Sequence, residues 1–293
     1  MSKQVFDFPY DLQTYLMSNG TLADRLRMLS AGFDVSREQT EQLLGTLEEL
    51  LNKDGGIPFG LKPGHPSSVK ETAEVLMLLK SFTTSHSRLI GKMVHFLVSR
   101  QKMDGGFAEA LNLDHIIEDK YGGTVGRDWY PVGKSITWLT GKALEALCSV
   151  AYEDGNRVRK ARDFLTHLQN EDGHWPDFKG QNESDPLATG NILPALVAAG
   201  IDSQNKVYND GRAALMQHLK RSLEQKSTQD MVDLVAVCAP KSELEREVIR
   251  KGIELVLTTQ NKDGGWSQMG SKKSDPELTS LLAFAIKKCT PIT

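Results

Sequence analysis

Residues 260–266 read Gln-Asn-Lys-Asp-Gly-Gly-Trp, and the chain carries three further variants of this heptapeptide. The other copies are residues 51–57, 101–107 and 169–175; every copy contains an Asp-Gly pair, and all but the first end in an aromatic residue. Glycine adopts left-handed backbone angles without steric cost, and Asp accepts hydrogen bonds from nearby amides, so the pair is typical of a turn just past a helix end. Repeats of this kind fix the fold class, because each one is a structural module that must stack on its neighbours.

Amphipathic helices flank each copy. Apolar residues recur at i, i+3 and i+4 almost throughout, and period-two alternation is nearly absent, which predicts about twelve helices paired into hairpins. The expected pairs are residues 11–17 with 22–33, 36–52 with 69–82, 87–102 with 135–152, 157–170 with 186–199, 211–224 with 229–239, and 244–261 with 276–288. Gln101, Gln169 and Gln260 are expected in the last turn of a first helix, with the amide bonded to backbone of the neighbouring repeat.

The two helices of a pair differ in polarity. First helices carry many charges, whereas second helices are rich in small and apolar residues, and a helix that is apolar on most sides is buried. We therefore predict an all-α fold in which residues 1–293 form a single (α/α)6 toroid, or barrel, of six inner second helices and six outer first helices. In such a ring the last hairpin packs on the first, so that no exposed end needs a cap.

Composition excludes several functional classes. The net charge of −3 offers no basic field for nucleic acid. No run approaches the roughly 20 apolar residues that a membrane span needs. The three cysteines are isolated, and together with the absence of an export signal they predict a cytoplasmic protein.

A Gln-x-x-Asp-Gly-Gly-Trp repeat that precedes an apolar, Thr-containing helix resembles the superfamily of terpene cyclases and protein prenyltransferase β-subunits. Squalene–hopene cyclases of this superfamily carry the repeat many times. The resemblance covers approximately residues 40–290. It implies the α/α toroid, a central cavity lined by the inner helices, and isoprenoid chemistry as the commonest use of that cavity.

The starts of the inner helices are the first candidate site. If all inner helices run the same way, their N-termini gather at one rim, where helix dipoles and free amides favour an anionic group such as a diphosphate. Glu71, Asp185 and Asp275 lie at these starts and are candidate catalytic carboxylates, and Thr72 and Asn191 are candidate substrate contacts on the cavity wall. The alternative is that the acidic residues only cap the helices, which Asp185 and Asp275 suit because each precedes a proline.

Residues 68–73 resemble the proton-donor segment of squalene–hopene-type cyclases, Asp-x-Asp-Asp-Thr-Ala. That motif needs adjacent carboxylates, so that one stays protonated and can attack an alkene. Here Ser68 and Lys70 replace the first two acids, and only Glu71 keeps a carboxylate. The departure argues against ordinary alkene protonation from this helix.

A metal site is not predicted. The zinc site of protein prenyltransferases uses an Asp-x-Cys pair and a His at an inner-helix start; the chain lacks the pair, and Asp185 and Asp275 occupy the His position. No cofactor is required on this interpretation, although a diphosphate substrate would bring Mg²⁺ with it.

Residues 108–134 are the second candidate site, predicted as a long loop at the cavity mouth. Within it Asp128 is a candidate acid or base. The candidate substrate contacts are Arg127 and Lys134 for phosphate oxygens, and Trp129, Tyr130 and Trp138 for the ring faces that stabilise a carbocation. The alternative is a surface lid held by its own salt bridges.

These features predict a terpene-cyclase-like enzyme, an isomerase or lyase, that acts on a small hydrophobic prenyl substrate or its diphosphate. Aromatic residues make up only 7% of the chain, which weakens a cationic cascade. Two alternatives stay open: a non-catalytic module that binds a lipid or peptide, and an enzyme of another class on the same fold.

Overall fold

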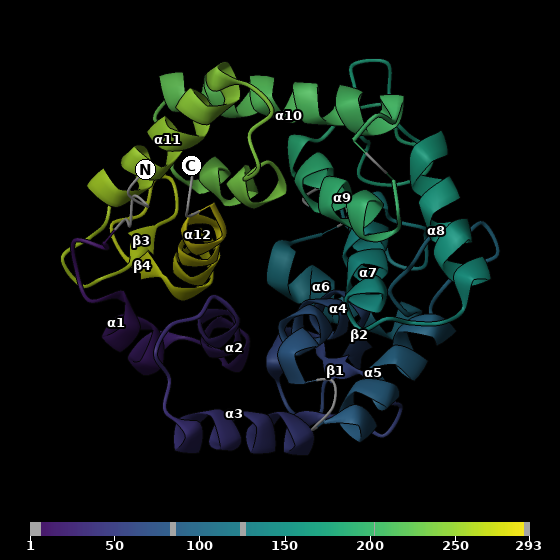
Figure 1. Ribbon diagram of the computed structural model, residues 1–293. Coiled ribbons are helices and arrows are strands. Elements are labelled where there is room, and N and C mark those ends of the chain that lie inside the picture. The colour runs from purple at the N-terminus through teal and green to yellow at the C-terminus, as the bar shows by residue number, and fades with distance from the viewer. Residues whose placement is uncertain (1–6, 83–85, 124–126, 202, 290–293) are drawn as a thin grey trace. The chain divides into compact units, whose positions relative to one another are not determined.

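The computed structural model describes residues 7–82, 86–123, 127–201 and 203–289, and its elements are almost all helical (Figure 1). The α-helices are α1 Leu12–Asn19, α2 Leu22–Ser30, α3 Arg37–Leu50, α4 Val69–Leu78, α5 Ser87–Ser99, α6 Asp114–Tyr121, α7 Thr137–Ser149, α8 Gly155–His167, α9 Pro186–Ala198, α10 Lys206–Glu224, α11 Glu243–Thr258 and α12 Pro276–Cys289. The 3-10 helices are η1 Phe59–Leu61, η2 Lys80–Phe82, η3 Leu111–Leu113 and η4 Gln229–Ala236. The strands are two-residue pairs, β1 Ile57–Pro58 with β2 Ser67–Ser68 and β3 Trp266–Ser267 with β4 Ser274–Asp275. The predicted all-α class is confirmed.

The chain divides into two compact units. The middle unit is Thr46–Ala214, and the terminal unit combines Met1–Gly45 with Leu215–Thr293. Helices α3 and α10 each contribute to both units.

In the middle unit, α7 lies between α4 and α9 and packs against both, while α5 covers α4 and α8 covers α7 (Figure 1). Gly141 permits the close approach of α7 to α9, because a Cβ there would lie 2.7 Å from the carbonyl oxygen of Asn191. Helix α9 begins at Pro186, and its N-cap Asp185 accepts a hydrogen bond from the amide of Leu187 (2.9 Å). The second helices of the hairpins thus form one layer, as their small and apolar residues predict.

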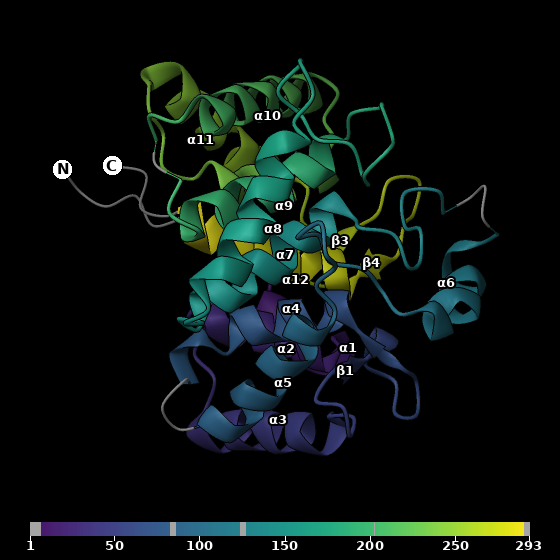
Figure 2. The ribbon, with the colours of Figure 1, turned by 90° about the vertical axis from the view of Figure 1, so that its right-hand side faces the viewer.

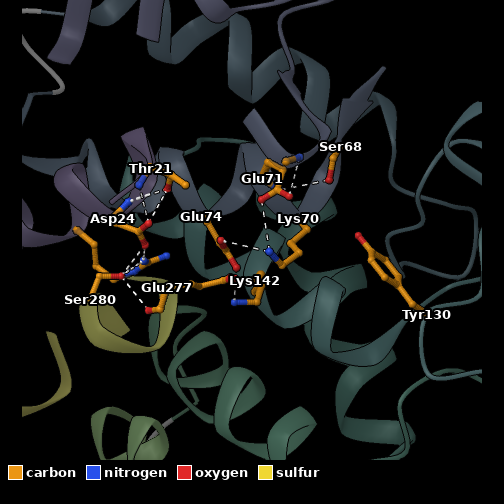
Figure 3. Close-up of polar contacts among 12 residues, drawn as sticks. Thr21, Asp24, Ser68, Lys70, Glu71, Glu74, Tyr130, Lys142, Glu277 and Ser280 are labelled. Atoms are coloured by element: carbon orange, nitrogen blue, oxygen red, sulfur yellow. Dashed lines mark hydrogen bonds and ion pairs between the residues drawn. The ribbon is translucent and has the colours of Figure 1, made fainter. Parts of the chain in front are cut away.

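In the terminal unit, α12 lies between α2 and η4, and α1 and α11 pack against this layer. A buried polar group joins α2 to α12: Asp24 bonds to the guanidinium of Arg27 (3.0 Å) and to the hydroxyl of Ser280 (2.7 Å). Figure 3 shows Asp24 and Ser280 pointing toward each other from these two helices. Helix α2, the second helix of the first hairpin, and α12, the second helix of the last hairpin, are therefore neighbours.

In each signature turn the Asp accepts a hydrogen bond from a backbone amide two residues on and from a serine hydroxyl. In the last copy, Asp263 Oδ1 accepts the amide of Gly265 (3.0 Å) and the hydroxyl of Ser274 (2.8 Å), and the Trp266 amide donates to Thr279 Oγ1 (2.9 Å). The same Asp–Ser bond joins Asp54 to Ser67, Asp104 to Ser135 and Asp172 to Ser184. The turn and the start of the following helix are thus one rigid piece.

The glutamines of the repeats link neighbouring hairpins. Gln260 Nε2 donates to Tyr10 O (3.2 Å), and the Tyr10 amide donates back to Gln260 Oε1 (3.0 Å). The equivalent bonds of earlier copies run from Gln101 Nε2 to Arg157 O (2.9 Å) and from Gln169 Nε2 to Val207 O (2.8 Å). The predicted amide link is confirmed, although these glutamines lie just beyond the helix ends. Gln101 and Gln169 thus contact the hairpin that follows them in sequence. Gln260 contacts the first hairpin in the same way.

Two segments differ from the prediction. Residues 229–239, expected as an α-helix, contain the 3-10 helix η4. The expected long loop 108–134 contains η3 and α6, which Ile117 anchors by its buried side chain; residues 124–126 lie outside the described part. Figure 2 shows α6 projecting away from α7 and α9. Within the described ranges, no helix has the length and apolar character that a membrane span requires.

Candidate functional site

Two carboxyl groups meet at the start of α9. Asp185 is the N-cap of this helix, and its amide donates to Trp175 O (2.8 Å), which holds it beside the segment that follows the third signature turn. On that segment Asp177 is hydrogen-bonded to Asp185 and accepts a bond from Gln181 Nε2 (3.4 Å). Asp177 is only 7% exposed, and among the described residues its Oδ1 has no hydrogen-bond partner. The site therefore pairs the buried carboxyl group of Asp177 with the half-buried carboxyl group of Asp185.

The pair holds a proton near neutral pH. Burial raises the pKa of Asp177 from 3.8 to about 7, and the hydrogen bond and the charge of Asp185 act in the same direction. The charge of Asp128 raises this pKa further. Two close carboxylates cannot both ionise easily, so one remains a carboxylic acid. Two predicted catalytic residues, Asp128 and Asp185, thus raise the pKa of a third acid, Asp177. Asp177 itself was not predicted from the sequence.

A sequence signal for Asp177 does exist. Asp177 stands two residues after the signature aromatic Trp175, and Glu109 stands two residues after Phe107. Each acid lies at the N-terminus of the second helix of the preceding hairpin. The Thr137 amide of α7 donates to Asp177 O (2.8 Å), and the Val69 amide of α4 donates to Glu109 Oε2 (2.8 Å). Extending the repeat comparison past the aromatic would have found both.

Aromatic rings gather beside α7. Trp129 stacks on Tyr130 with 5.3 Å between ring centroids, Tyr130 meets Trp138 edge-to-face at 4.9 Å, and Tyr121 meets Trp129 at 5.2 Å. The indole nitrogen of Trp138 donates to Trp129 O (3.3 Å). The three predicted aromatic contacts therefore form one cluster, with Trp138 in the first turn of α7, next to Thr137 and the backbone of Asp177.

Glu109 anchors this cluster to α4. Its carboxylate is 2% exposed and accepts four hydrogen bonds, from Tyr130 OH (2.8 Å), Ser68 Oγ (2.8 Å), and the amides of Val69 (2.8 Å) and Lys70 (3.1 Å). Burial raises the pKa of Glu109. A carboxylate at a helix N-terminus is stabilised by the free amides and the dipole, so Glu109 both caps α4 and fixes Tyr130.

A ladder of charges runs along α4 and α7. The ammonium of Lys70 lies 3.4 Å from Glu71 Oε2 and 3.7 Å from Glu74 Oε2, and the ammonium of Lys142 lies 2.9 Å from Glu74 Oε1. The other oxygen of Glu71 accepts the Gly60 amide (3.1 Å). Figure 3 shows Glu74 reaching toward Lys70 and Lys142. The predicted acid Glu71 is thus an ion-paired carboxylate in this structure.

Two further predicted residues, Thr72 and Arg127, form contacts within the protein itself. Thr72 is fully buried; its hydroxyl donates to Ser68 O (2.6 Å) and accepts the Ile57 amide (2.9 Å), which gives it a structural role. Arg127 is buried and bonds to Asp114 (2.6 Å).

The last three predicted residues, Lys134, Asn191 and Asp275, each make a separate contact. The ammonium of Lys134 lies 5.0 Å from the centre of the Phe178 ring. Asn191 is half-buried, and its amide donates to Leu187 O (2.8 Å). Asp275 belongs to the terminal unit, where it accepts the Leu278 amide (2.8 Å) as a helix cap.

The terminal unit holds a Ser-His-Asp group that is not a nucleophile site. Ser222 Oγ donates to Asp230 Oδ2 (2.7 Å), and His218 Nε2 lies 3.5 Å from Ser222 Oγ and 3.8 Å from Asp230 Oδ2. In a catalytic triad one imidazole nitrogen meets the serine and the other meets the acid, whereas here the same nitrogen faces both. Within the described residues, no group of three or more His, Cys, Asp or Glu side chains is arranged to hold a metal ion.

Comparison with known proteins shows the fold. No family model matches the chain, and no curated protein sequence matches it. A variant of the type II terpene cyclase MstE from Scytonema, solved with its substrate geranylgeranyl dihydroxybenzoate, superposes with a TM-score of 0.67 at 15% identity over 92% of this chain and 86% of that one. The ent-copalyl diphosphate synthase from Streptomyces platensis gives 0.61 at 22% identity over 91% of this chain and 49% of that one.

The chain therefore shares the all-α fold of MstE and of the ent-copalyl diphosphate synthase, and this is the fold class that the signature repeats predict. The same fold also occurs in a protein described as a novel α-amylase from Clostridium perfringens, with a TM-score of 0.60 at 10% identity over 92% of this chain and 85% of that one. Fold alone does not decide the reaction, so the function is argued from the carboxyl pair and the aromatic cluster.

Proposed function

We propose that the chain is a terpene-cyclase-like enzyme that protonates an alkene of a prenyl substrate, with Asp177 as the acid. The observation that supports this is the carboxyl pair, in which the burial of Asp177, and then its neighbours Asp185 and Asp128, raise the pKa of Asp177 to about 7. A carboxylic acid beside a second carboxylate is the arrangement that alkene protonation needs. The acid stands on the segment after a signature turn, while the usual acid positions at 68 and 70 hold Ser and Lys.

The reaction is an isomerisation. Proton transfer breaks the O–H bond of Asp177 and the alkene π bond and forms one C–H bond, which leaves a carbocation in the substrate. Trp129 and Trp138 would present ring faces that stabilise this cation. Loss of a proton from carbon to a carboxylate forms a new alkene, and we assign that base role to Asp128, which is exposed and exchanges the proton with water.

The other residues hold the aromatic and charged side chains in position. Glu109 holds Tyr130 and with it the aromatic cluster, and Asp114 holds Arg127. Lys134 and Asn191 stay proposed substrate contacts, and Glu71 and Asp275 are not retained as acids because both are engaged with backbone amides.

Incubation of the protein with farnesol, geranylgeraniol and squalene, followed by mass spectrometry of isomeric products, tests the proposal. Asp177→Asn should lower turnover at least about 100-fold, which is the usual range for loss of a general acid. The exposed Asp119→Asn is the matched control and should keep full turnover. Activity should fall as the pH rises through about 7, where Asp177 loses its proton.

Turnover that survives in Asp177→Asn would refute the assigned acid. Binding of all three compounds by the wild-type protein with no product from any would identify a non-catalytic lipid-binding module instead.

A further inference from the structure

The proposed acid lies on a short segment, residues 176–181, whose backbone is held against the start of α7. The Thr137 hydroxyl donates to Asp177 O (2.7 Å), and the Lys179 amide donates to Ser135 O (3.1 Å). These bonds fix the backbone at Asp177, but they do not act on its carboxyl group. The orientation of that carboxyl group is set by a different residue.

Gln181 contacts Asp177 through both ends of its side-chain amide. Its Oε1 accepts the Asp177 amide (2.8 Å), and its Nε2 donates to Asp177 Oδ2 (3.4 Å). A backbone amide can only donate, so the oxygen of Gln181 faces it and the nitrogen is left for the carboxyl group. The turn between the two residues is closed by the bond from the Gln181 amide to Phe178 O (3.2 Å), with Gly180 at a φ of +99°. Gln181 therefore restricts the rotation of the Asp177 carboxyl group.

The bond from Gln181 also affects how readily Asp177 gives up its proton. Burial and the carboxyl groups of Asp185 and Asp128 favour the protonated form, whereas the donor of Gln181 favours the ionised form and lowers the pKa of Asp177. An acid that ionises more readily is a better proton donor to an alkene. Loss of this donor would leave Asp177 a weaker acid.

The basic side chains of the neighbouring segments have partners of their own. These contacts are Lys134 with the Phe178 ring (5.0 Å), His174 with Thr189 Oγ1 (2.8 Å) and Lys179 with Asp104 (3.3 Å). Gln181 thus supplies a hydrogen-bond donor at a place where Asp185 and Asp128 supply negative charge.

We propose, on the basis of the proposed function, that Gln181 is a positioning residue for the acid Asp177. It holds the carboxyl group in one orientation through Oδ2 and keeps the group acidic enough to give its proton to the alkene. No bond to Gln181 forms or breaks in the reaction, because the proton passes from Asp177 to the substrate.

Two variants separate this role from a purely structural one. Gln181→Glu keeps an oxygen for the Asp177 amide and replaces the N–H donor by a carboxylate, whereas Gln181→Met loses both contacts. If Gln181 only accepted the backbone amide, Gln181→Glu would behave as the wild type does. Asn182→Asp makes the same change from amide to carboxylate at the next residue, which is exposed, and is the matched control. Circular dichroism checks that each variant is folded.

The first readout needs no substrate. Carbon-13 NMR follows the aspartate carboxyl groups from about pH 4 to about pH 10, and Asp177→Asn identifies the Asp177 signal. The midpoint lies at about 7 in the wild-type protein. It should rise by about one pH unit or more in Gln181→Glu, because the lost donor and the added charge both disfavour ionisation, and by less in Gln181→Met. Asn182→Asp should move it by less than about 0.3 pH units.

The second readout is turnover of the prenyl compound that the wild-type protein converts. At about pH 6, where Asp177 stays protonated, kcat should fall about tenfold or more in Gln181→Glu and in Gln181→Met. KM should change less than about twofold, since the substitutions act on the acid and not on substrate contacts. The pH at which activity declines should rise together with the NMR midpoint of Asp177.

An unchanged NMR midpoint in folded Gln181→Glu would overturn this role of Gln181, whatever the turnover. Wild-type kcat and pH dependence in the same variant would overturn it as well. A shifted midpoint with no product from the wild-type protein would instead overturn the proposed function, and with it the part of Gln181 in a reaction.

Discussion

Replacement of Asp177 by Asn should stabilise the protein at about pH 8 and leave its stability nearly unchanged at about pH 4. The pKa of Asp177 is raised to about 7 in the folded protein from an ordinary value of 3.8. Between these two values the folded state binds the proton and the unfolded chain releases it, so stability falls as the pH rises through this window and stays low above it. Asn has no proton to lose, and the variant lacks this loss of stability.

The magnitude follows from the shift. A difference of about three pKa units corresponds to about 4 kcal/mol, since each unit corresponds to about 1.4 kcal/mol. Asp177 and Asp185 share the proton, so the full shift does not belong to one residue, and we expect a gain of roughly 2–3 kcal/mol for Asp177→Asn at about pH 8. Because the Asn amide can donate to the Asp185 carboxylate, the hydrogen bond of the pair is kept.

Urea-induced unfolding followed by circular dichroism, across a series of pH values from about 4 to about 8, measures this difference. Asp119→Asn removes an exposed carboxylate and should stay within about 0.5 kcal/mol of wild type at every pH. Asp185→Asn keeps a good N-cap but removes the partner charge, so the pH dependence should shrink. A difference between Asp177→Asn and wild type that is the same at both ends of the pH series, or a variant less stable at high pH, would refute a raised pKa at this residue.

Two further predictions concern packing of the repeats and of the aromatic cluster. Gly264→Ala should lose more than about 3 kcal/mol of stability, because φ is +94° and a Cβ there would lie 2.2 Å from Asp11 O. Gly270→Ala, with φ of +80° and open space around it, should lose only about 1–2 kcal/mol, and equal losses in urea unfolding would contradict the close approach. Tyr130→Phe should lose about 1–3 kcal/mol by removing the hydroxyl that bonds to buried Glu109, and an unchanged unfolding curve would show that this bond contributes nothing.

The fold could be predicted because its signals are local. Helical periodicity and the Asp-Gly turns are read within a few residues, and the structure places helices close to most of the expected ranges. Gln260 could be assigned a link to a neighbouring repeat because the same residue recurs at the same place in three copies. The 3-10 geometry of η4 was missed because apolar spacing over so short a segment does not distinguish it from an α-helix.

The site was harder to predict because its chemistry depends on contacts between segments far apart in sequence. Glu109 becomes a cap only because it meets the start of α4, forty residues earlier. Thr72 was predicted to contact substrate on the cavity wall. Its hydroxyl instead bonds to the backbone of Ser68 and of Ile57 in the neighbouring strand β1. Asp128 and Asp185 were recognised as acids; the position of Asp177 could be found from the repeats, but its raised pKa depends on burial, which sequence alone does not reveal.

The bonds between Tyr10 and Gln260 have a consequence for how the molecule is made on the ribosome. An open solenoid can complete each module as it is synthesised, since each one contacts only its neighbours. Here the terminal unit joins Met1–Gly45 to Leu215–Thr293, so its first segment emerges early and finds its packing partner only after Thr46–Ala214 has been translated. At 5–20 residues per second that interval is roughly 10–30 seconds, during which the apolar surface of α1 and α2 is available to chaperones.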